Sequence, residues 1–261
     1  MGTPGPALAC IRTMNDPVKL SWESGGIAIV SMEDRESKNR SSPRFDRAIT
    51  AAFQEIAAQP SAKVVVIHGY DNFFCCGGSW DELMQIADGK AVFTDFAFYD
   101  EPLRCELPVV AAMQGHAIGG GLAFGCFADL MVLADESVYS ANFMQLGFTP
   151  GVGATWSIPR KFGSVLGWEM MWTAASYRGM QLRERGASMP IVKKAEVIPH
   201  ALTVARDLAD MPLVSLKEMK RHYVAAIRSD LDATVRNELA MHQRIFAQPG
   251  IRERIESLYQ P

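Results

Sequence analysis

The chain has 261 residues, of which 48% are hydrophobic and 21% are charged, so it is long enough to bury a sizeable core. Its formal net charge is −3, so basic residues are not in excess, which argues against a nucleic-acid partner. Five cysteines without CxxC or Cys/His spacing argue against a disulfide framework and a metal site, and favour a reducing, cytoplasmic environment.

Residues 1–16 contain no basic region followed by an apolar run, so we expect a loose leader rather than a signal peptide. Nowhere is there an apolar run of about 18 residues, and no membrane span is expected. Alternating apolar and polar residues around a Gly-Gly turn predict a β-hairpin over 18–34. Helical spacing follows at 44–59, and the β-branched run at 63–70 predicts a buried parallel strand.

The stretch FFCCGGSWDELM, residues 73–84, follows that strand directly. Ser79, with Glu82 three residues later, has the spacing of a capping box and predicts the start of a helix. Adjacent Cys75 and Cys76 are interpreted as small apolar residues at a strand end, in preference to a redox pair.

Residues 90–105 show no clear period and predict a loop or short helix. Residues 107–135 predict a strand, a glycine-rich turn, an apolar helix and a further strand. Another strand and a Gly/Pro-rich loop reach residue 163, and the rest is nearly all helical apart from a short strand at 190–192. We therefore predict an α/β core over 17–195 and a helical C-terminal region over 196–261.

Two segments share one design, in which an apolar strand leads into a glycine-rich turn, CCGGS or AIGGGL, and then into a helix. Glycine lets another atom approach the backbone closely, and a helix start supplies free N–H groups. Two such turns side by side in a parallel sheet could aim two N–H groups at one oxygen. For either turn alone, close packing of helix on sheet is the alternative. Neither turn has the spacing of a dinucleotide- or phosphate-binding loop.

The order FFCCGGSWDEL, then LPVVAAMQGHAIGGGLAFGCFADLMVLADES, then GFTPGVGAT resembles the enoyl-CoA hydratase/isomerase (crotonase) superfamily over residues 17–260. The resemblance implies a ββα-spiral core, a helical region that forms a homotrimer, and an oxyanion hole for a thioester carbonyl. The two donors of that hole map onto the backbone N–H groups of Gly78 and Gly120.

Hydratases of the superfamily carry two glutamates that handle water, and this chain has Ala123 and Phe143 at those positions. Without these carboxylates water has no general base there, so hydration and isomerisation are disfavoured. The strings YRGMQLRERG and NELAMHQRIF, together with the motifs above, resemble instead the decarboxylases of polyketide β-branching cassettes.

That resemblance implies decarboxylation of a 3-methylglutaconyl thioester on an acyl carrier protein, through a dienolate, to a 3-methylcrotonyl thioester. It implies no metal and no cofactor beyond the phosphopantetheine of the carrier. His242 matches the histidine of this branch and is the expected acid for the dienolate, since imidazole titrates near neutrality. Where some members carry a lysine this chain has Trp80, which leaves the binding of the leaving carboxylate open.

Trp80, Phe143 and Ala123 are expected to form an apolar pocket that disfavours a solvated carboxylate relative to CO₂. A loose basic cluster is either a solvated face or a contact for the carrier protein, and consists of Arg183, Arg185, Lys193 and Lys194.

Two alternatives stay open. One is another crotonase reaction, such as dehydration or hydrolysis, on a CoA or carrier thioester. The other is a non-catalytic scaffold, against which the two retained glycine turns argue, because a scaffold has no need for bare N–H donors.

Overall fold

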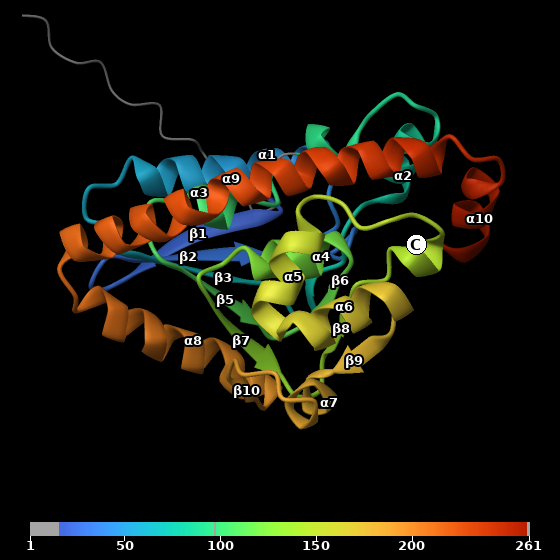
Figure 1. The fold of residues 1–261 in the computed structure, drawn as a ribbon. Coiled ribbons are helices and arrows are strands. Elements are labelled where there is room, and N and C mark those ends of the chain that lie inside the picture. Colours follow the sequence, from blue (N-terminus) through green and yellow to red (C-terminus); the bar gives the residue numbers. More distant parts are fainter. Residues whose placement is uncertain (1–15, 97, 260–261) are drawn as a thin grey trace, which may run out of the picture.

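The computed structural model describes residues 16–96 and 98–259, which fold into two β-sheets with helices around them (Figure 1). The larger sheet has the order β1 (Val18–Glu23), β2 (Ile27–Met32), β3 (Val64–His68), β5 (Val109–Met113), β7 (Leu130–Ala134) and β10 (Ile191–Val192). β1 pairs antiparallel with β2, and all other neighbours in this sheet are parallel. The predicted hairpin and the predicted buried strand at 63–70 are confirmed. Residues 1–15 of the expected leader, Cys10 among them, lie outside the described residues.

The smaller sheet has the order β4 (Phe73–Cys75), β6 (His116–Ile118), β8 (Val138–Ser140) and β9 (Ser176–Arg178). β4 follows β3, β6 follows β5 and β8 follows β7 after only a few residues, so the chain passes three times from the larger sheet to the smaller one. The sequence predicts none of β4, β6 and β9 as separate strands, because three residues are too few to show a period.

The helices alternate with these strands first and then dominate the chain (Figure 1). They are α1 (Pro43–Ala57), α2 (Trp80–Ala87), α3 (Glu101–Arg104), α4 (Gly120–Cys126), α5 (Ala154–Phe162), α6 (Ser164–Thr173), α7 (Gly179–Glu184), α8 (Lys194–Ala209), α9 (Leu213–Phe246) and α10 (Ile251–Leu258), with 3₁₀ turns η1 (Phe93–Asp95) and η2 (Met144–Leu146). The capping box at the start of α2 is confirmed, with Ser79 and Glu82 each accepting the other's backbone N–H. Within the described residues no helix is both long and apolar enough to cross a membrane.

α8 covers one face of the larger sheet, where small alanines such as Ala201 and Ala205 pack on the valines of β3, β5 and β7. The opposite face carries the main core, which α1 and α4 close with buried aromatic and aliphatic side chains. The β-branched runs of the parallel strands are buried on both faces for this reason. The division of the chain at residue 195 stays a prediction.

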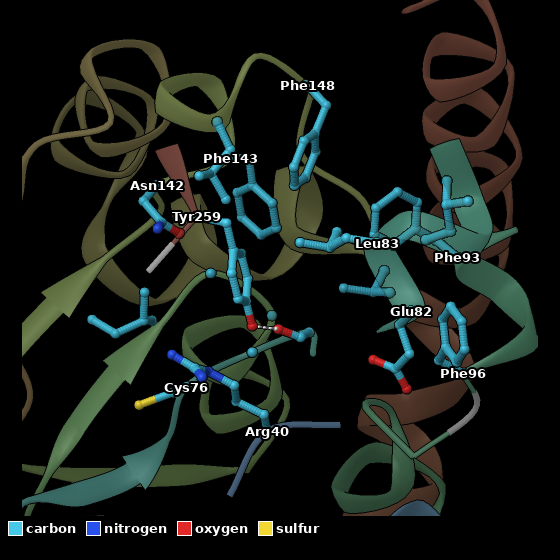
Figure 2. Close-up of a pocket in the computed structure, with 18 of the residues that line it drawn as sticks. Arg40, Cys76, Glu82, Leu83, Phe93, Phe96, Asn142, Phe143, Phe148 and Tyr259 are labelled. Atoms are coloured by element: carbon cyan, nitrogen blue, oxygen red, sulfur yellow. Dashed lines mark hydrogen bonds between the residues drawn. The ribbon is translucent and has the colours of Figure 1, made fainter. Parts of the chain in front are cut away.

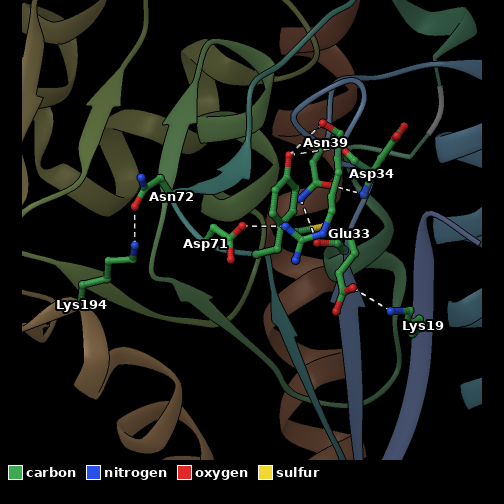
Figure 3. Close-up of polar contacts among 10 residues, drawn as sticks. Lys19, Glu33, Asp34, Asn39, Asp71, Asn72 and Lys194 are labelled. Atoms are coloured by element: carbon green, nitrogen blue, oxygen red, sulfur yellow. Dashed lines mark hydrogen bonds and ion pairs between the residues drawn. The ribbon is translucent and has the colours of Figure 1, made fainter. Parts of the chain in front are cut away.

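The loop between β2 and α1 is fastened to the strands on either side by the amide of Asn39 (Figure 3). Its Nδ2 donates to the carbonyls of Met32 at 3.0 Å and Phe74 at 2.8 Å, while its Oδ1 accepts the N–H of Asp34. Asn39 has φ of +54°, a left-handed conformation that asparagine tolerates well. As a result the residues that follow, up to Ser41, are held beside the first glycine turn.

α5 begins within the stretch that the sequence predicts to be a Gly/Pro-rich loop, so that expectation is wrong from residue 154 onward. The start of α5 is held by the buried carboxylate of Glu238 on α9, which accepts the N–H groups of Gly153 at 2.7 Å and Thr155 at 2.8 Å. These bonds satisfy donors that a helix start leaves free, and no local sequence pattern reveals them. α9 thereby holds the TPGVG loop in place.

Candidate active site

A cavity of about 330 Å³ opens beside the two glycine-rich turns (Figure 2). Its walls come from α2, the segment around η1, the β6–α4 turn, the segment around η2 and the end of α10. The aromatic lining consists of Phe93, Phe96, Tyr99, Phe143, Phe148 and Tyr259. The polar side chains on the lining are Arg40, Glu82, Asn142 and Gln145.

The two glycine turns lie against one another, as the sequence analysis expects. β4 and β6 are parallel neighbours, with Cys75 opposite Ala117. A Cβ on Gly77 would lie 2.7 Å from the carbonyl oxygen of Ile118 and 3.2 Å from the nitrogen of Gly120. Gly77 also has φ of +78°, where a side chain is strained. Both turns therefore require glycine for contact between their backbones.

Gly78 and Gly120 both line the cavity. Among the backbone hydrogen bonds of the described residues, neither glycine's N–H is a donor, whereas the N–H of neighbouring Gly119 donates to the carbonyl of Ser140. Gly120 is the first residue of α4, where the N–H has no partner within the helix. Two residues that line the cavity thus have backbone N–H groups without an acceptor among the described residues.

Tyr259 holds the first turn from the C-terminal side. Its hydroxyl donates to the carbonyl of Gly78 at 3.1 Å, drawn as a dashed line in Figure 2. The ring packs against Trp80 at 5.4 Å between centroids, and the guanidinium of Arg40 lies 5.2 Å from the centre of the Tyr259 ring. The carbonyl of Gly78 is thereby occupied, and its peptide plane is held in one orientation.

A polar cluster borders the cavity behind Gly78. The hydroxyl of Ser41 lies 2.6 Å from Oε1 of Glu82 and 3.0 Å from both carboxyl oxygens of Asp46. Burial, followed by the nearby charge of Glu82, raises the pKa of Asp46 to about 7. Burial also raises the pKa of Glu82, against the hydrogen bonds from Ser41 and Ser79. Burial raises the pKa of Tyr99 well above its usual value.

Of the residues predicted to bind substrate, Phe143 lines the cavity, while Ala123 and Trp80 do not. Ala123 is fully buried on α4 behind the turn, and half-buried Trp80 packs against the ring of Tyr259, which lines the cavity. The roles of these three residues in substrate binding stay predictions.

His242 lies on α9 and is only 2% exposed. It does not line this cavity but a neighbouring one of about 320 Å³, and Phe93, which lines both cavities, stands edge-on to its ring with 4.0 Å between centroids. Its Nε2 is hydrogen-bonded to the carbonyl of Pro150 at 2.8 Å. Burial lowers the pKa of His242 to about 4, so its ring is neutral at pH 7.

Cys75 is buried at the end of β4, and Cys76 lines the cavity. Both are free thiols, and burial raises the pKa of Cys76 to about 11, so its thiol stays protonated. In the described part of the chain, no group of three or more His, Cys, Asp or Glu side chains is placed to hold a metal ion.

No sequence pattern predicts a place in the site for Arg40, Tyr99, Tyr259 or the Ser41–Asp46 pair, and the pattern around Glu82 predicts helix capping alone. Arg40 and Ser41 come from a loop that is placed beside the glycine turn by the amide of Asn39 and by the bond from the Ser41 N–H to the carbonyl of Gly77. Tyr259 is nearly at the end of the chain, far in sequence from the residues it touches. The capping box was the one signal that singled out Glu82.

Comparison with known proteins places this geometry in a wider context. The enoyl-CoA hydratase/isomerase family model matches residues 23–260. The bacillaene synthase decarboxylase PksI of Bacillus subtilis is 43% identical over 242 residues, which cover 93% of this chain and 97% of that protein. A solved structure from a dehydratase/decarboxylase enzyme couple of polyketide β-branching is 42% identical, with a TM-score of 0.91, and covers 94% of this chain and 100% of that one. The ECH2 decarboxylase domain of CurF from Lyngbya majuscula is 36% identical, with a TM-score of 0.90 and the same coverage.

Proposed function

The chain belongs to the enoyl-CoA hydratase/isomerase family and is a decarboxylase of polyketide β-branching, and we propose that its substrate is a 3-methylglutaconyl thioester on an acyl carrier protein. The product is then the 3-methylcrotonyl thioester. The observation that carries this proposal is the pair of bare N–H groups, from Gly78 and Gly120, in a cavity with apolar walls.

The reaction breaks the bond between the carboxylate carbon and the γ carbon of the acyl chain. The electron pair of that bond spreads over a dienolate, whose negative charge rests mainly on the thioester oxygen as CO₂ leaves. We assign Gly78 and Gly120 as donors to this oxygen. One such preorganised donor contributes about 3–4 kcal/mol to the transition state, because the charge develops only there.

The cavity has aromatic walls that include Phe143 and Phe148, and Phe143 stands at a position where a hydratase would carry a glutamate. An apolar wall favours neutral CO₂ over a solvated carboxylate. Arg40, which also lines the cavity, supplies a positive charge that can attract the substrate carboxylate during binding. We therefore assign the recognition of the substrate carboxylate to Arg40.

The dienolate must finally take up a proton at its γ carbon. His242 remains the sequence-based candidate for this acid. It is neutral and separated from the cavity by Phe93, so it can reach the substrate only if that ring moves aside.

The acyl chain arrives on the phosphopantetheine arm of the carrier, and no further cofactor takes part in the proposed steps. The basic cluster considered for carrier docking is largely engaged within the chain, since Arg185 pairs with Glu169 and Lys193 with Asp135. We retain acyl carrier protein as the partner and a homotrimer as the assembly on the strength of the family resemblance.

The test is to incubate the protein with 3-methylglutaconyl-loaded acyl carrier protein and to follow the intact mass of the carrier. We expect the loss of one CO₂, with the thioester retained. A folded protein that binds the loaded carrier and releases no CO₂ would overturn the assignment and return weight to dehydration, to hydrolysis or to a scaffold role. A His242→Ala variant in the same assay tests the sequence-based acid.

A further inference from the structure

The short oxygen–oxygen contacts in the polar cluster behind Gly78 require one hydrogen more than the Ser41 hydroxyl alone can supply. A serine hydroxyl has a single hydrogen and can donate it to only one acceptor. Yet Ser41 lies within hydrogen-bond distance of Glu82, at 2.6 Å, and of Asp46, at 3.0 Å. If both carboxyls were ionised, one of these short oxygen–oxygen contacts would lack a proton. The arrangement is satisfied when the two carboxyls share one proton across the Ser41 hydroxyl.

The three side chains form a line from the solvent side to the cavity. Asp46 on α1 is half-buried and does not line the cavity, Ser41 is fully buried, and Glu82 is 3% exposed and lines the cavity. Oε2 of Glu82 lies 3.8 Å from the point that a Cβ on Gly78 would occupy, so the carboxyl borders the oxyanion turn. A proton taken up at Asp46 can therefore pass through Ser41 to Glu82, which lines the cavity.

The reaction needs such a route, because loss of CO₂ from a carboxylate consumes one proton for each turnover. We propose that Glu82 delivers this proton to the γ carbon of the dienolate, and that Ser41 and Asp46 position and replace it. The O–H bond of Glu82 breaks, the C–H bond forms, and the electron pair returns from the thioester oxygen. Glu82 is left ionised until a proton passes from Asp46 to Ser41 and from Ser41 to Glu82. This inference rests on the proposed decarboxylation.

When substrate is bound, the charges around the pair favour the proton on Glu82 over the proton on Asp46. A negative dienolate beside Glu82 disfavours the ionised carboxyl by like-charge repulsion, which moves the shared proton from Asp46 towards Glu82. The other titratable groups around the pair are Arg40, Arg47, Cys75, Asp81, Tyr99 and Tyr259. Burial raises the pKa of Cys75, Tyr99 and Tyr259, so these three stay neutral and leave the balance to the two carboxyls.

His242 fits a different role in this scheme. Its Nε2 is bonded to the carbonyl of Pro150, and its ring would clash with a Cβ on Gly151, 2.6 Å from Cε1. It therefore holds the TPGVG loop and the ring of Phe93 in place, as a positioning residue of the wall. With Glu82 as the acid, no movement of Phe93 is required for proton transfer.

The experiment measures kcat between pH 5.5 and 9 (a range set by the pKa of about 7 for Asp46) with 3-methylglutaconyl-loaded acyl carrier protein. The variants are Glu82→Gln, Asp46→Asn and His242→Ala, and Asp81→Asn, an exposed acid one residue away, is the matched control. Glutamine keeps the acceptor for the Ser79 N–H, so the cap of α2 survives. CO₂ release by the wild type establishes the proposed function independently of which acid is used.

We expect kcat of the wild type to fall above about pH 7, as the pair loses its shared proton. Glu82→Gln should lower kcat at least about tenfold and remove this fall. Asp46→Asn should move the fall to another pH, and Asp81→Asn should leave the pH profile unchanged. If Glu82→Gln keeps the pH profile of the wild type and a kcat within about threefold of the wild-type value, the proposal is overturned. If Glu82→Gln fails to fold, Asp46→Asn decides, and an unaltered pH profile in that variant overturns the relay.

Discussion

The N–H of Gly120 can be removed with little disturbance of the backbone, because Gly120 is the first residue of α4. Proline is well tolerated at this helical position, where the missing N–H would have no partner within the helix. Gly120 has no positive φ and belongs to α4, and helical φ values lie close to the one that proline fixes. We predict that Gly120→Pro abolishes one of the two oxyanion donors while α4 still forms.

Any side chain at this position also introduces a Cβ, which would lie 2.9 Å from Cε1 and from the hydroxyl oxygen of Tyr99. Ordinary contact begins at 3.4 Å, so the Tyr99 ring must retreat by about 0.5 Å. Such overpacking typically costs about 1–3 kcal/mol of stability. Gly120→Ala has the same contact but keeps the N–H, and is therefore the matched control.

The two variants should have similar melting temperatures and different rates. Loss of one oxyanion donor lowers kcat about 10²- to 10³-fold, which corresponds to about 2.7–4 kcal/mol. We expect this factor between Gly120→Ala and Gly120→Pro in the carrier-mass assay, under single-turnover conditions that isolate the chemical step. Equal rates in two folded variants would refute the assignment of this N–H to the thioester oxygen.

Three further predictions concern stability. Glu238→Ala leaves two N–H groups at the start of α5 without an acceptor and should lower the free energy of unfolding by about 3 kcal/mol in urea titrations; a loss below about 1 kcal/mol would contradict the capping role. Lys220→Ala breaks the buried ion pair with Asp129, 2.6 Å long, and should cost about 3–5 kcal/mol, whereas Lys220→Met should cost less because its stem still packs. The carboxyl of Asp46 holds its proton up to about pH 7 in the folded state but only to about pH 4 in the unfolded state. The free energy of unfolding should therefore fall as the pH rises from about 4 to about 7. Asp46→Asn should remove that fall, and an unchanged pH dependence would show that the carboxyl is not protonated as assigned.

Much of the fold follows from the sequence because long elements carry a period. The hairpin, α1, the parallel strands β3, β5 and β7 and the C-terminal helices all have patterns that burial and exposure explain. The failures concern short or tertiary-determined elements. β4, β6 and β9 contain three residues each, and α5 starts in a glycine-rich segment where Glu238, more than eighty residues later, accepts its free N–H groups.

The residues of the site likewise fall into those that lie in sequence motifs and those that only the fold brings together. Gly78, Gly120 and Phe143 lie on the cavity, as their motifs indicate, since the turns are contiguous in sequence and glycine is required by the contact between them. Arg40, Tyr99 and Tyr259 reach the cavity from segments without a motif, and the fold alone assembles them. Side chains that converge from separate elements have no pattern that a single sequence can display.

Glu82 shows why a correct local interpretation can conceal a second role. Its Oε2 accepts the N–H of Ser79, a bond that stabilises the ionised carboxyl and accounts fully for the residue in the sequence. Its Oε1 faces Ser41 and a second carboxyl, an arrangement that requires a proton. The two halves of one side chain therefore favour opposite charge states, and the carboxyl can gain or lose a proton at modest cost. A group balanced in this way next to an oxyanion hole is suited to give a proton when negative charge develops and to take one back when the product leaves.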